Sequence, residues 1–183
     1  DFGKNVLPAM LNAGERMFAY RFEGYWKDVG TISSLWEANM DLLGEEPAFD
    51  VADSHWKIHS RNPLAPPEYL GEHAVLKNSM VALGCEIYGT VENSVLSSNV
   101  VVEEGAVVKD AVIMSGTVVK SGASVRYSIV DEDVVIGEGA SIGEDKAAAK
   151  GIAVLGKNIS VGKNAWVAAG NIVDKNIAEG EEA

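Results

Sequence analysis

Residues 101–143 decide the fold, because they repeat one pattern: VVEEGAVVKDAVIMSGT (101–117), then VVKSGASVRYSIVDEDV (118–134), then VIGEGASIG (135–143). Glycine recurs at an interval of 17 residues, at Gly105, Gly122 and Gly139. Apolar residues keep the same interval in three series: Val102, Val119 and Ile136; Val108, Val125 and Ile142; Val112 and Ile129. A period of this length is typical of a solenoid, in which each repeat packs only on its neighbours.

A shorter period of six residues lies inside each repeat and later continues alone, at Leu155, Val161, Val167 and Val173. Each hexad reads as a short strand followed by a tight corner, where a small residue leaves room for the turn. Three hexads make one triangular coil of about 18 residues, here shortened by one, whose aliphatic residues point inward. A β-sandwich is the alternative, but it would need more aromatic residues and longer polar loops.

The sequence therefore predicts a mainly β protein built around a parallel β-helix of hexapeptide repeats. Families with this signature form left-handed helices, and the expected hand is taken from that resemblance. Hexapeptide helices serve several unrelated functions, so the fold by itself does not assign one.

The chain divides by composition into residues 1–45, 46–74 and 75–183. In the first part we expect a helix from Asn5 to Gly14, a strand over residues 17–22 and a second helix from Ser34 to Gly44. Ser34 and Glu37 have the spacing of a capping box, and the apolar face of this helix comprises Leu35, Ala38 and Leu42, with Trp36, Met40 and Leu43 adjoining. Residues 46–74 are predicted to be a linker, because they hold most of the prolines, which block helix interiors and sheet centres.

Bulk properties exclude several classes of function. The net charge of −12 and the pI near 4.6 argue against nucleic acid as a partner, which would need clustered Lys and Arg. The single cysteine, Cys85, rules out an internal disulfide framework and suits a cytoplasmic protein. No apolar run approaches the length needed to span a bilayer, so we expect no membrane association.

The three histidines bear on the commonest enzymes of this fold. Acyltransferases with hexapeptide repeats use a histidine as general base, and the zinc-dependent members need histidine ligands from neighbouring coils. His55, His59 and His73 all precede the registered repeats, and residues 75–175 contain no histidine. The sequence therefore weakens both interpretations.

The segment Phe22-Glu23-Gly24-Tyr25-Trp26-Lys27-Asp28-Val29-Gly30-Thr31 is the strongest candidate for chemistry. A carboxylate beside a glycine turn is well placed to hold Mg²⁺, which prefers a few carboxylates together with substrate phosphates. On physical grounds alone, an Asp28 that caps the following helix or accepts backbone hydrogen bonds is the better supported alternative.

This segment resembles the W-x-D-x-G-T motif near the end of the catalytic domain in sugar-phosphate nucleotidyltransferases. The surrounding text is more specific: residues 1–8 (DFGKNVLP), 24–31 (GYWKDVGT) and 35–43 (LWEANMDLL) are similar to the bacterial glucose-1-phosphate adenylyltransferases. The linker with Arg61-Asn62-Pro63 and the β-helix after it also fit this family, so the resemblance covers essentially the whole chain.

The resemblance implies an enzyme that makes ADP-glucose and pyrophosphate from ATP and glucose 1-phosphate, for glycogen or starch synthesis. It implies that Asp28 is one of two carboxylates that hold Mg²⁺ and that Trp26 lies near the sugar-nucleotide pocket. It also implies a homo-oligomer, a tetramer in this family, whose β-helix packs on the catalytic domain and on other subunits. Effectors are then expected to bind near the junction of the two domains.

The sequence departs from the family in what it lacks, and this changes the activity expected of the chain alone. The glycine-rich nucleotide loop G-x-G-x-R-L-x-P is absent, and the chain opens at Asp1 without a methionine. We therefore expect a C-terminal fragment that is inactive alone and serves oligomerisation and allosteric regulation. Two alternatives stay open: a non-catalytic regulatory paralogue, and the tail of a guanylyl- or thymidylyltransferase.

Overall fold

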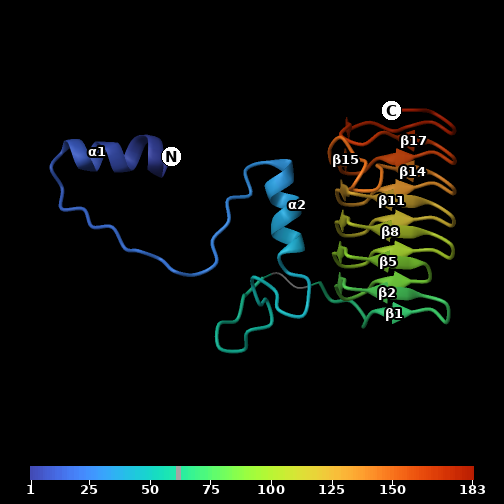
Figure 1. Ribbon diagram of the computed structural model, residues 1–183, viewed down its shortest axis with the longest axis horizontal. Coiled ribbons are helices and arrows are strands. Elements are labelled where there is room, and N and C mark those ends of the chain that lie inside the picture. The colour runs from blue at the N-terminus through green and yellow to red at the C-terminus, as the bar shows by residue number, and fades with distance from the viewer. Residues whose placement is uncertain (61–62) are drawn as a thin grey trace.

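The computed structural model describes residues 1–60 and 63–183, so that Arg61 and Asn62 of the linker lie outside the described residues. A stack of β-strand coils forms most of the molecule, and one helix, α2, stands beside it (Figure 1). The strands form three parallel sheets of six strands each, so each turn of the chain gives one strand to each sheet. The predicted parallel β-helix of hexapeptide repeats is confirmed.

The three sheets are named here by the order in which the chain visits them. Sheet A contains β1 (Tyr69–Leu70), β4 (Glu86–Ile87), β7 (Val101–Val102), β10 (Val118–Val119), β13 (Val135–Ile136) and β16 (Ser160–Val161). Sheet B contains β2 (Val75–Lys77), β5 (Thr90–Glu92), β8 (Val107–Lys109), β11 (Ser124–Arg126), β14 (Ser141–Ile142) and β17 (Trp166–Val167). Sheet C contains β3 (Met80–Val81), β6 (Val95–Leu96), β9 (Val112–Ile113), β12 (Ser128–Val130), β15 (Ala153–Leu155) and β18 (Ile172–Val173).

The strand register confirms the 17-residue period. Val119 pairs with Val102 on one side and with Ile136 on the other. The other two series pair in the same way: Val125 with Val108 and Ile142, and Ile129 with Val112. The four residues of the plain hexads also lie in consecutive strands, from β15 to β18.

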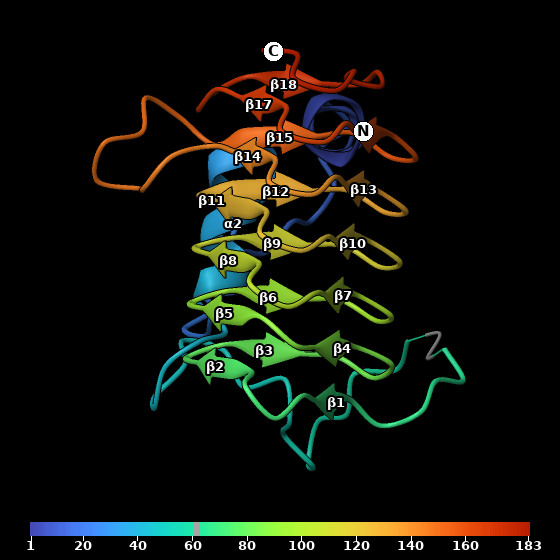
Figure 2. The same cartoon turned by 90° about the vertical axis from the view of Figure 1, so that its right-hand side faces the viewer.

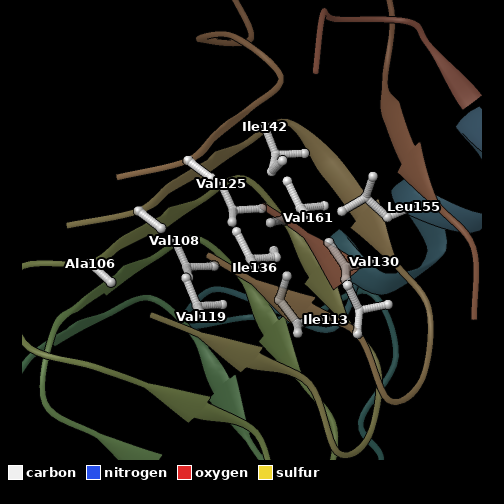
Figure 3. Close-up of a cluster of buried hydrophobic side chains, with 14 of the residues drawn as sticks. Ala106, Val108, Ile113, Val119, Val125, Val130, Ile136, Ile142, Leu155 and Val161 are labelled. Atoms are coloured by element: carbon white, nitrogen blue, oxygen red, sulfur yellow. The ribbon is translucent and has the colours of Figure 1, made fainter. Parts of the chain in front are cut away.

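The core is a set of aliphatic stacks that fill the inside of the coils. Figure 3 shows side chains from all three sheets pointing into one shared interior, among them Val125, Ile136 and Leu155. These three side chains have no exposed surface. Burying a side chain of this size contributes about 1.5–3 kcal/mol, and every turn of the helix repeats the contribution.

The corners of the coils depend on residues that accept a left-handed backbone. Asparagine and aspartate supply most of the non-glycine positions with positive φ, as expected from their tolerance of this conformation. At one corner three of them form a ladder, because Asn78 Nδ2 donates to Asn93 Oδ1 at 2.8 Å and Asn93 Nδ2 donates to Asp110 Oδ1 at 2.6 Å. Each turn of this corner is thereby tied to the next by side chains as well as by backbone.

The first helix begins earlier than predicted. The Asp1 side chain accepts a hydrogen bond from the Lys4 backbone N–H, so the chain is already wound in a π-helical turn over Phe2–Val6. The α-helix α1 (Leu7–Asn12) continues from it, and the expected cap at Asn5 is wrong. None of the residues in these two elements is buried.

The predicted strand over residues 17–22 is wrong. This described segment is an extended coil, and it pairs with none of the described strands. Its aromatic residues Phe18 and Tyr20 are 84% and 90% exposed. An alternating sequence forms a strand only where a neighbouring strand satisfies its backbone, and no strand within residues 1–60 and 63–183 pairs with this segment.

Helix α2 (Ile32–Met40) begins before the predicted position. Thr31 is its cap: the Thr31 side chain accepts a hydrogen bond from the Ser34 N–H, and the Ser34 hydroxyl accepts one from the Thr31 N–H. Ser34 is therefore the third residue of the helix and not its cap. The capping-box prediction had the right motif but placed it three residues too late.

The linker and the end of the stack show two further features. Strand β1 lies inside the predicted linker, residues 46–74. The Tyr69 N–H donates to the Cys85 carbonyl, and through this pairing β1 joins sheet A. The division into residues 1–45, 46–74 and 75–183 stays a prediction. Among the described residues, none of the helices has the length and apolar character required to cross a membrane.

Candidate functional site

The segment 22–31 lies between α1 and α2 and is held to α2 by two of its side chains. Tyr25 Oη donates to Asp41 Oδ2 at 3.0 Å, and Lys27 Nζ donates to the same oxygen at 2.7 Å. Lys27 Nζ also lies 3.4 Å from Glu37 Oε2. Asp41, directly after α2, is therefore the point at which this segment is attached to the helix.

The electrostatics of this attachment favour its charged form. The hydrogen bond from Lys27 lowers the pKa of Asp41, and the reciprocal hydrogen bond to Asp41 raises the pKa of Lys27. Burial, followed by the hydrogen bond to Asp41, raises the pKa of Tyr25. At neutral pH the lysine and the aspartate are thus an ion pair, with the tyrosine hydroxyl protonated beside them.

Asp28, the predicted metal ligand, lies on the exposed side of the segment. Its Oδ1 accepts a hydrogen bond from the Gly30 N–H at 3.0 Å, which shapes the turn that leads into the Thr31 cap of α2. The backbone-accepting role that the residues alone favoured is therefore present. The residue is exposed to solvent.

Trp26, the predicted substrate-binding residue, is 77% exposed. Neither Trp26 nor Asp28 lines the hollow that lies beside the segment. This hollow is lined by five apolar or aromatic residues and two carboxylates: Phe22, Tyr25, Phe49, Trp56 and Ile58, with Asp50 and Asp53. Tyr25 and Phe49 stack there with ring centroids 5.5 Å apart.

Helix α2 joins this segment to the β-helix through one buried residue, Trp36. Its Nε1 donates to the Asp110 carbonyl at 2.7 Å, and its ring packs edge-on against Tyr127 at 5.0 Å between centroids. It shares a small core with Val112, Ile129 and Ile152, all from or next to sheet C. Leu35 of the predicted apolar face and the adjoining Met40 also pack against this core, but the buried centre of the contact is Trp36, which was predicted only to adjoin that face.

Sequence reasoning did not identify the partners of Trp36. Tyr127 and Asp110 occupy corner positions with positive φ. The repeat pattern predicts a turn at such positions and does not predict a contact with a distant helix. The one available signal was an aromatic residue at a corner of a repeat in which the other corners carry Asn, Asp or Gly.

The histidines do not assemble into a site. His55 is 96% exposed, with Nδ1 3.4 Å from Asp53 Oδ1, and His59 and His73 are also exposed. Within residues 1–60 and 63–183, no group of three or more His, Cys, Asp or Glu side chains is arranged to hold a metal ion. Any metal at Asp28 would therefore take most of its ligands from bound substrate or from elsewhere.

Comparisons with known proteins give two matches in a definite order along the chain. Residues 1–45 match the model of the nucleotidyl transferase family, and residues 68–152 match the GlmU-like C-terminal hexapeptide family. The first match contains the whole segment 22–31 and α2, and the second contains most of the β-helix.

Curated proteins that are similar to the chain carry the name of one enzyme. A glucose-1-phosphate adenylyltransferase of Clostridium perfringens is 56% identical over 108 residues, and one of Bacillus mycoides is 54% identical over 108 residues. Over these 108 residues, the chain is similar to both of these glucose-1-phosphate adenylyltransferases. Each match covers 59% of this chain and 28–29% of the relative, so the chain spans less than a third of the length of these adenylyltransferases.

Proposed function

We propose that this chain serves as the C-terminal part of a glucose-1-phosphate adenylyltransferase. The reaction would join ATP and glucose 1-phosphate to give ADP-glucose and pyrophosphate, as a cytoplasmic step of glycogen synthesis. One observation carries this proposal: a nucleotidyl transferase segment with Asp28 in its motif is fixed, through Trp36 of α2, to a hexapeptide β-helix. Relatives that bear the adenylyltransferase name are 54–56% identical to the chain over 108 residues, which is 59% of its length.

Asp28 would contribute one carboxylate to a Mg²⁺ ion in this reaction. Mg²⁺ is commonly held by one or two carboxylates plus substrate phosphates, so a single exposed carboxylate on a fixed turn fits its preferences. The ion would supply charge neutralisation to the phosphates. This chain's own residues keep the turn in place: Gly30 by its N–H, and Lys27 and Tyr25 through Asp41.

Replacing Asp28 with asparagine tests the proposed metal role. ADP-glucose formation is measured in the longest polypeptide that the gene encodes, as a function of Mg²⁺ concentration. We expect Asp28→Asn to lower the rate on the order of a hundredfold and to raise the Mg²⁺ concentration needed for half-maximal rate, because a charge that stabilises the transition state is lost. Asp174→Asn, an exposed position on the β-helix, is the control. An unchanged rate and Mg²⁺ requirement in Asp28→Asn would overturn the metal role.

The β-helix would also serve assembly and regulation, with a homotetramer as the assembly and effector binding near the α2 junction. An open sheet edge is prone to association, and the first strand, β1, exposes Tyr69 and Leu70 at the end of the stack. Closed symmetric oligomers are the usual outcome when such surfaces associate. Sedimentation velocity across a hundredfold concentration range is expected to show a species larger than a monomer. A monomer throughout would contradict this role.

A further inference from the structure

The corner between β14 and β15 carries extra residues that the other turns lack. Ile142 and Leu155 are 13 positions apart, whereas their partners in the preceding turn, Val125 and Val130, are five apart. The additional residues leave the stack as a loop, drawn in orange beside β14 in Figure 2. Residues 144–151 are called the strap below.

The strap is tied to the outer face of sheet B. Asp145 Oδ2 accepts from Arg126 Nη1 at 2.9 Å, and Asp145 Oδ1 lies 3.9 Å from Lys109 Nζ. Arg126 and Lys109 belong to the two preceding turns of the helix. The strap therefore folds back along the stack, toward the side on which α2 is docked.

The next residue of the strap reaches α2 itself. Lys146 Nζ lies 4.4 Å from the centroid of the Trp36 ring and 5.9 Å from that of Tyr127. An ammonium group at this distance over an aromatic face is attracted by the ring quadrupole. Because the Trp36 and Tyr127 rings meet edge-on, a single cation contacts the pair from α2 and the β-helix at once.

The strap completes the enclosure of Trp36. Directly after the strap, Ile152 is buried in the small core that Trp36 shares with Val112 and Ile129. Trp36 is only 5% exposed, although it projects from a helix whose other residues are mostly half-buried or exposed. The β-helix holds one side of the indole through the Asp110 carbonyl, and the strap adds Lys146.

We propose that the strap is a latch, in which the charge of Lys146 holds α2 against the β-helix. Removing that charge would let α2 and the attached segment 22–31 move more freely while the β-helix stays folded. This inference concerns the placement of α2 and does not depend on the reaction proposed above.

Hydrogen–deuterium exchange of the full 183-residue chain tests the latch. We expect Lys146→Met to raise the exchange rate of α2 amides about two- to fivefold, which corresponds to the loss of one exposed cation–π contact. Lys146→Arg keeps a cation over the rings and should restore the wild-type rate. Lys120→Met removes an exposed lysine after β10, on sheet A, and should change nothing.

Three results would overturn the latch. One is an exchange rate of α2 in Lys146→Met equal to that of the wild type. Another is an increase in this rate in Lys120→Met or in Lys146→Arg as large as that in Lys146→Met. The third is faster exchange throughout the β-helix peptides of Lys146→Met, which would show that Lys146 stabilises the whole fold and not the docking of α2.

Discussion

Asp41 binds two side chains of the segment 22–31 at its junction with α2. Its carboxylate accepts hydrogen bonds from the side chains of Tyr25 and Lys27. These two residues flank the exposed Trp26, so Asp41 holds the chain on either side of it. Asp28 follows Lys27 directly, and its own carboxylate is used locally by Gly30. The position of the candidate metal ligand thus depends on a residue that the motif itself does not contain.

Loss of this attachment at low pH follows from the lowered pKa of Asp41. A carboxyl whose pKa is lower in the folded than in the unfolded chain stabilises the fold above its ordinary value of 3.8, and this contribution is lost as the pH falls through the folded value. We expect protection factors of residues 22–31 to decrease below about pH 4 in the wild type. Asp41→Asn should show low protection at every pH. The same decrease in both proteins would contradict this role for Asp41.

At the scale of single elements, the corners of the β-helix limit which residues can be changed. Gly143, which follows β14 and leads into the strap, has φ of +68°, and a Cβ there would overlap the Arg126 carbonyl oxygen. Gly122 has nearly the same φ, +70°, but its nearest neighbour would be the Gly139 backbone nitrogen at 4.0 Å. A side chain would be conformationally strained at both positions, but it would overlap another atom only at Gly143.

Alanine at each of these glycines should reveal the difference. Both substitutions place a side chain in the left-handed region, which should lower the free energy of unfolding by about 1–2 kcal/mol. Gly143→Ala should lower the free energy of unfolding by about 1–3 kcal/mol more than Gly122→Ala does, because the backbone must shift to relieve the overlap. Urea unfolding measures both, and equal free energies of unfolding for the two variants would contradict the close approach at Gly143.

At the scale of the whole molecule, periodicity predicted the β-helix because the contacts that build it repeat in the sequence. A turn of 17 residues places Val102, Val119 and Ile136 in one stack, and the structure pairs them directly. The strand expected over residues 17–22 failed for the opposite reason, since its alternation has no partner strand in the described chain.

The site was only partly predictable for a related reason. The motif identified Asp28 and Trp26, and the resemblance to nucleotidyltransferases agrees with the match over residues 1–45. The docking of α2 through Trp36, Asp110 and Tyr127 joins positions about 75 to 90 residues apart, and no repeat or local pattern specifies such a contact.

Under the proposed function, this β-helix belongs to an enzyme that transfers an adenylyl group to glucose 1-phosphate. The most direct measurement incubates the longest polypeptide that the gene encodes with Mg²⁺, glucose 1-phosphate and either ATP, GTP or dTTP, and separates the sugar nucleotides by anion-exchange chromatography. We expect ADP-glucose from ATP as the main product, with pyrophosphate released in equal amount. A guanylyl or thymidylyl sugar as the main product, or no sugar nucleotide from any of the three, would contradict the proposed function.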